Sequence, residues 1–99
     1  MKYLVEATAS IERGNAIDAK GGPAPLFEYI GQRFKPEAIY GNPTRRQVFI
    51  IVDLPKETDV AELMLILARE TGTEPTFTPI MPAEAFDEPV ANAAKAPRI

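Results

Sequence analysis

The amino-acid sequence predicts an α+β domain built on a four-stranded antiparallel sheet. Three observations carry this prediction. Strand-like and helix-like segments follow one another in the order strand, helix, strand, strand, helix, strand. Residues 48–52 form an unbroken apolar run typical of a buried strand, and two other segments repeat apolar residues at helical spacing. A chain of 99 residues suits a single domain with a modest core.

The N-terminal part supplies the first strand and the first helix. Residues 2–9, KYLVEATA, form the first predicted strand. Residues 25–35 open with a proline, which suits the first turn of a helix, and carry apolar residues at helical spacing until Pro36 ends the pattern. Between these segments, GGP at 21–23 predicts a break, so residues 15–20 should form only one or two helical turns.

Two strands and a turn follow, and a fourth strand lies near the end. Residues 37–43 predict a short strand that runs into the turn formers of GNP. Residues 45–54, RRQVFIIVDL, then complete a hairpin. Residues 74–82, EPTFTPIMP, predict the last strand, and its prolines favour a position at a sheet edge.

The second helix is the clearest helical segment of the sequence. Residues 57–72, ETDVAELMLILARETG, carry an apolar stripe at helical spacing. Asp59 is the predicted N-terminal cap, with Glu62 completing a capping box, and Gly72 is the predicted C-terminal cap.

The element order is that of the ferredoxin-like β-α-β-β-α-β pattern. We therefore expect an antiparallel sheet with the first and third strands central and both helices on one face. Residues 1–86 form this α+β domain, and residues 87–99 form a tail rich in Ala and Pro that is mobile or docks on a partner.

The apolar run at 48–52 predicts a second copy of the chain as a partner. Adjacent residues of a strand point to opposite faces, so this strand is apolar on both. The helices cover one face, and leaving the other in water would forgo about 1.5–3 kcal/mol for each large side chain. A symmetric homodimer through the sheet faces, forming a dimeric α/β barrel, is the expected solution. We expect Ile50 to point into the core of the domain and Phe49 toward the opposite face, beside a cavity.

The residue types that are absent restrict the chemistry. The chain has no cysteine and no histidine, which excludes a thiolate nucleophile, a Ser-His-Asp triad and zinc sites built from His and Cys. No metal and no cofactor are predicted. Any catalysis would depend on Asp, Glu, Lys, Arg, Tyr or Thr, or on a bound cofactor.

Charge and hydropathy restrict the partners. The net charge is −3 with both signs interspersed, so no basic stripe for nucleic acid is present. No apolar run approaches the roughly 18 residues of a membrane helix, and the N-terminal segment lacks the pattern of a signal peptide. We expect a cytoplasmic protein without nucleic-acid or membrane partners.

Four motifs resemble a known superfamily. FKPEAIYG, VFIIVDLP, DVAELM and TFTPIMPAEAF are similar to segments of the small dimeric α/β-barrel proteins, which include muconolactone-isomerase-like, antibiotic-biosynthesis-monooxygenase-like and GYD-type domains. The resemblance covers about residues 2–86 and implies a barrel formed by two sheets across a dimer. It also implies a cleft between sheet and helices that binds small aromatic or polyketide-like molecules. The hairpin reads GNPTRRQ in place of the GYD tripeptide, and no catalytic residue is carried over.

Two functions follow as expectations. The first is a homodimer that binds a small apolar or aromatic molecule in the cleft. The alternative is a cofactorless isomerase or monooxygenase acting on a small aromatic or polyketide-like substrate.

The candidate ligand-binding residues are Glu6, Tyr29, Tyr40 and Phe49. Glu6 lies mid-strand, where it would act as a general base with a raised pKa or pair structurally with Arg or Lys. The two tyrosines would offer hydroxyl groups to a ligand or pack in the core with their tips satisfied. The pair at 45–46, two arginines beside the turn, would hold a carboxylate or phosphate or form a solvated hairpin tip.

Overall fold

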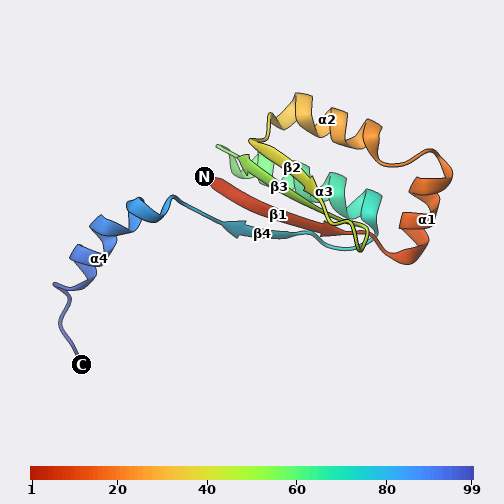
Figure 1. Cartoon of the computed structure of the whole chain (residues 1–99). Coiled ribbons are helices and arrows are strands. Elements are labelled where there is room, and N and C mark those ends of the chain that lie inside the picture. Colours follow the sequence, from red (N-terminus) through yellow and green to blue (C-terminus); the bar gives the residue numbers. More distant parts are fainter.

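The structure, a computed structural model that describes residues 1–99, confirms the α+β class and the four-stranded antiparallel sheet. The strands are β1 (Lys2–Thr8), β2 (Ala38–Gly41), β3 (Gln47–Asp53) and β4 (Thr76–Pro79). Their order is β2-β3-β1-β4, with each neighbouring pair antiparallel (Figure 1). The first and third strands are therefore central, and the proline-rich β4 lies at an edge, as the sequence predicts.

The first crossover contains two helices, α1 (Ile11–Ala19) and α2 (Ala24–Phe34). The predicted break between them is confirmed, with Gly21 and Gly22 at φ of +101° and +102°. Helix α1 is longer than the one or two turns expected, because Ser10 caps it: its Oγ accepts a hydrogen bond from the backbone N–H of Arg13 at 3.1 Å.

Helix α3 (Glu57–Thr71) ends at Gly72, which adopts a left-handed φ of 73° and confirms the predicted cap. The capping box predicted for its other end is wrong, because the helix begins earlier and Asp59 lies inside it. Both Asp59 and Glu62 instead accept hydrogen bonds from the guanidinium of Arg33 on α2, at 3.3 and 2.9 Å. These carboxylates tie the two helices together.

The core lies between one face of the sheet and helices α2 and α3. Antiparallel pairing places Val5 opposite Ile50 and Ala7 opposite Val48, so these side chains share a face. The side chains packed on this face belong to one cluster, to which α2 contributes Ile30 and Phe34 and α3 contributes Leu63 and Leu67. Ile50 is fully buried, as predicted.

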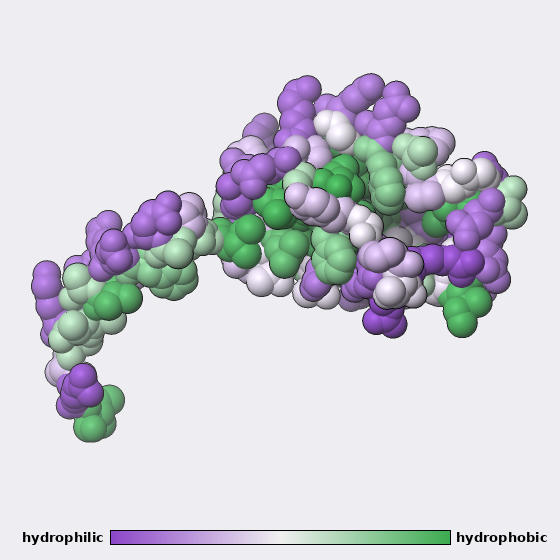
Figure 2. Space-filling view, in the orientation of Figure 1, coloured by the Kyte–Doolittle hydropathy of each residue, from purple (hydrophilic) through white to green (hydrophobic).

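The opposite face of the sheet, which we call the open face, is covered by no element of the chain. It carries Leu4 and Ile51, which pair across β1 and β3, together with Phe49. These three apolar side chains are half-buried. In the orientation of Figures 1 and 2 the strands lie in front of α3, so the viewer looks at the open face. Figure 2 shows hydrophobic side chains over the strands on this face. The strand at 48–52 is thus apolar on both faces, with one face left uncovered.

The C-terminal segment leaves the domain. It contains a short 3-10 helix, η1 (Ala83–Phe86), and α4 (Asp87–Ala93), and every residue of 81–99 is exposed. Figure 1 shows this segment projecting from the end of β4 away from the sheet. No helix of the structure combines the length and the hydrophobicity that crossing a bilayer would require. The cytoplasmic location stays a prediction.

Candidate functional site

A pocket of about 300 Å³ opens on the helix-covered side of the sheet, near the β2–β3 hairpin. It lies between the strands β1 and β3 and the three helices α1, α2 and α3, and part of the hairpin forms its mouth. Its wall is largely apolar, with side chains from Ala7, Ile17, Leu26, Phe27, Val48 and Leu67.

The pocket exists because side chains become small toward this end of the sheet. Ala7, Val48 and Gly41 lie side by side across β1, β3 and β2, whereas the neighbouring row contains Val5 and Ile50, both fully buried. A Cβ added at Gly41 would meet no atom within 4 Å. A gap therefore remains between the helices and the sheet at this row. At the neighbouring row, larger side chains fill the corresponding space.

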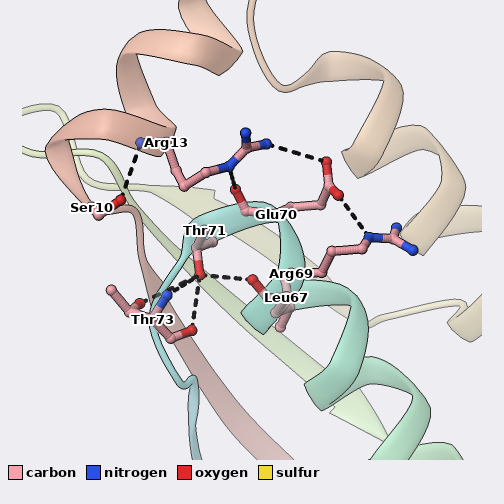
Figure 3. Close-up of polar contacts among 7 residues, drawn as sticks. All are labelled: Ser10, Arg13, Leu67, Arg69, Glu70, Thr71 and Thr73. Atoms are coloured by element: carbon pink, nitrogen blue, oxygen red, sulfur yellow. Dashed lines mark hydrogen bonds and ion pairs between the residues drawn. The ribbon is translucent and has the colours of Figure 1, made fainter.

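Helix α1, one wall of the pocket, is fixed to the end of α3 by backbone-directed hydrogen bonds (Figure 3). Ser10 N–H donates to the carbonyl of Thr71 at 2.8 Å, and Arg13 Nε donates to the carbonyl of Glu70 at 3.0 Å. Carbonyl groups at a helix end lack partners within the helix, so Arg13 satisfies one of them. This contact sets the position of α1 over the sheet.

Thr71 is a buried residue of the pocket wall, and its hydroxyl forms hydrogen bonds at the end of α3. Its Oγ1 donates to the carbonyl of Leu67 at 2.7 Å and accepts from the N–H of Thr73 at 3.3 Å. The hydroxyl of Thr73 in turn donates to the carbonyl of Thr8 at the end of β1. These hydrogen bonds hold the strand end and the helix end together and engage the Thr71 hydroxyl in the fold.

Arg46 joins the hairpin to α1 at the mouth of the pocket. Its guanidinium contacts Asp18 Oδ2 at 2.9 Å through Nη2 and Asn15 Oδ1 at 3.0 Å. The side chain crosses α1 at Gly14, where a Cβ would collide with Arg46 Cδ. Glycine at this position therefore allows the arginine to reach Asp18.

Arg45 also lines the pocket but has no such partners. It is exposed and takes part in no ion pair and no side-chain hydrogen bond. Close by, Asn42 is engaged within the hairpin, because its Nδ2 donates to Gln47 Oε1 at 3.0 Å and its Oδ1 accepts from Thr44 N–H at 2.9 Å. Arg45 is thus the free guanidinium at the mouth.

A second, more open pocket of about 580 Å³ adjoins the first at the hairpin end of the sheet. The two pockets share Ala9, Asn42, Arg45 and Arg46. Thr8 and Thr44 belong to the wall of the second pocket alone. The first pocket, with its apolar wall, and the second pocket, with its mixed wall of polar and apolar residues, therefore meet at the two arginines.

The predicted site residues lie elsewhere. Tyr40, Phe49 and Glu6 stand next to one another across β2, β3 and β1 on the open face, and Tyr29 is an exposed residue of α2. None of the four lines either pocket described above. Glu6 makes no ion pair and no side-chain hydrogen bond, so the structural pairing weighed for it is absent, and the roles of these residues stay predictions.

Sequence reasoning missed the apolar wall, although it weighed the arginines as an anion site. The sequence signal that could have revealed this wall was the pair of small residues Ala7 and Gly41, which become neighbours only in the right strand register.

No group of three or more acidic residues gathers to hold a metal ion. Outside the site, two side chains have raised pKa values. A hydrogen bond to Glu37 raises the pKa of Lys2, and a hydrogen bond to Glu62 raises the pKa of Arg33.

Comparisons with protein-family models, with curated proteins and with solved structures find no match for this chain.

Proposed function

We propose that this protein binds a small apolar or aromatic molecule in the pocket between the sheet and the helices. The observation that carries the proposal is the pocket itself: its volume of about 300 Å³ matches the lower range of small-molecule sites, and apolar side chains dominate its wall. The strand order and the placement of α2 and α3 on one face are compatible with a ferredoxin-like fold, which we propose for the domain.

Filling the pocket should abolish binding without unfolding the domain. In a Gly41→Leu variant the new side chain enters space that is empty in the structure. We expect wild-type protein to bind members of a library of small aromatic compounds, seen as perturbed NMR signals of Ala7 and Val48, and the variant to lose this response. Gly31→Leu is the matched control, because Gly31 lies on α2 outside the pocket wall and also has free space around it. Equal binding by Gly41→Leu and wild type would contradict the proposed site.

We further propose that two copies associate through the open face. Leu4, Phe49 and Ile51 there are apolar side chains that the chain itself leaves uncovered. Packing this face on a second copy would bury them symmetrically and provide the dimer of an α/β barrel. Light scattering at micromolar concentration is expected to give about twice the chain mass of 10.9 kDa. A mass equal to that of one chain would refute the dimer.

The C-terminal segment supports the same assembly. Phe86 and Val90, four positions apart, are both more than half exposed. A helix of seven residues is marginal in water by itself, so α4 needs a surface to pack on. Pro82 holds an extended conformation at φ −57° and ψ 146°, directing the segment away from its own domain. We propose that this segment docks on the second copy.

Removing the segment tests its part in the assembly. A chain that stops after Ile80 keeps all four strands and should dissociate at higher protein concentration than the full chain. A full chain with Phe86→Ser and Val90→Ser should behave in the same way, whereas Ala93→Ser serves as a mild control at the end of α4. Unchanged dissociation in both altered chains would show that the segment takes no part.

The enzymatic alternative, a cofactorless isomerase or monooxygenase, is favoured by one observation. Tyr40, Phe49 and Glu6 form a continuous row on the open face, which a dimer would enclose. A carboxylate without a partner, enclosed in the same row as the hydroxyl of Tyr40, would be placed to act as the general base of such an enzyme. Because Glu6 lies outside the pocket, the binding function stands without it.

A further inference from the structure

We infer that the ligand is an amphipathic carboxylate, with an apolar or aromatic body in the first pocket and its carboxylate paired with Arg45. The inference rests on the proposed binding function and adds the chemical class of the ligand. It follows from the way the first pocket and the second pocket share one boundary.

The boundary selects a molecule with one apolar end and one polar end. Ile17, Leu26 and Phe27 line the first pocket, whereas the second adds the hydroxyl groups of Thr8 and Thr44 to a mixed wall that also contains Ile11. A wholly apolar molecule would leave the polar side unused, and a wholly polar one would lose the hydrophobic contribution of the first pocket. A molecule that crosses the boundary at residues 45–46 uses both.

The charge at this boundary favours an anion. Asp18 neutralises Arg46 through a contact of 2.9 Å, whereas Arg45 has no partner of opposite charge. The side chain of Asn42 is held in place by Gln47 and Thr44, so Arg45 is the free positive charge among the shared residues. Its guanidinium can donate two parallel hydrogen bonds to a carboxylate.

The charge at the boundary favours a carboxylate over a phosphate group. The one guanidinium without an acidic partner, that of Arg45, balances the single charge of a carboxylate, whereas a phosphate dianion would keep one charge without a partner there. Arg46 is already held by Asp18 and Asn15 at 2.9 and 3.0 Å, and Asp18 balances its charge. Arg45 is therefore the residue that determines specificity.

The test compares 2-naphthoate with its neutral amide, 2-naphthamide, on the full-length protein. Their apolar bodies are the same, so the ratio of affinities reports the charged contact. We expect the acid to bind about tenfold more tightly than the amide, the lower end for a charge-assisted hydrogen bond because the site is partly open to water. Arg45→Gln should reduce this ratio to about one while the amide binds as before.

A matched control separates a local contact from net charge. Arg98→Gln removes the same charge from the C-terminal segment and should leave the ratio unchanged, and Arg45→Lys should retain part of it. If wild-type protein binds both compounds equally, or if Arg45→Gln keeps the preference, the carboxylate assignment is overturned although the binding function stands. If neither compound perturbs the signals of Ala7 and Val48, the carboxylate assignment fails as well. The proposed function itself fails only if the wider aromatic library also gives no response.

Discussion

Ile50→Ala should destabilise the domain by about 2–5 kcal/mol, the range for truncating a large side chain in a packed core. Ile50 is fully buried and lies on β3 in the middle of the sheet, where it is packed among core residues of the strands and helices. The space left by its side chain cannot collapse easily between elements fixed on both sides. Urea denaturation followed by circular dichroism measures this loss.

Phe49→Ala is the matched variant, because Phe49 is adjacent in sequence and points to the open face. Its truncation should weaken the proposed dimer, so the denaturation midpoint of this variant should depend on protein concentration differently from that of wild type. Ile50→Ala should lower the midpoint by a similar amount at every concentration. The same concentration dependence in both variants would contradict the division of β3 into a core face and a face between subunits.

The elements that the sequence predicted correctly are those determined by local chemistry. Gly21 and Gly22 interrupt the first crossover whatever surrounds them, and Gly72 ends α3 because it accepts a left-handed backbone. The apolar run at 48–52 likewise predicts a strand buried on at least one face. In each of these cases the residues adjacent in the sequence are sufficient to predict the local structure.

The features that were missed depend on contacts between distant residues. Asp59 was expected to cap a helix, but Arg33, which lies on another helix, binds its carboxylate at 3.3 Å. Ser10 was not recognised as the start of α1, although its hydroxyl caps the helix, because no apolar pattern marks that helix. A short polar helix held by tertiary contacts leaves little periodic signal.

The resemblance implied a cleft between sheet and helices, but the residues that line the pocket could not be predicted, because they are a property of the register. Ala7 and Gly41 are far apart in the sequence and become neighbours only through Val48, with which both pair. A shift of one residue in either pairing would turn a small side chain to the other face and fill the gap. The same register gathers Glu6, Phe49 and Tyr40 on the open face, away from the cleft in which the resemblance to barrel proteins placed the ligand.

Gly72→Ala is expected to be the most damaging of the conservative changes at a helix end. The residue has a φ of 73°, and a left-handed conformation costs an L-residue roughly 1–2 kcal/mol. The added Cβ would also lie 2.8 Å from Arg13 Cγ and 3.0 Å from Ser10 Oγ, so these side chains, which hold α1 in place, must shift. We expect a loss of about 2 kcal/mol or more in urea denaturation, since crowding adds to the backbone cost.

Gly31→Ala is the control: the same glycine-to-alanine change is expected to stabilise the domain there instead of destabilising it. Gly31 lies within α2 with no atom within 4 Å of the new Cβ, so alanine should stabilise the helix by up to about 1 kcal/mol.

The two variants should also differ in ligand binding. Because Arg13 and Ser10 position α1 against α3, Gly72→Ala should weaken ligand binding in the pocket, and Gly31→Ala should leave it unchanged. A Gly72→Ala protein as stable as wild type, with full ligand affinity, would show that α1 is free to move and that the hydrogen bonds of Arg13 to α3 do not set the pocket wall.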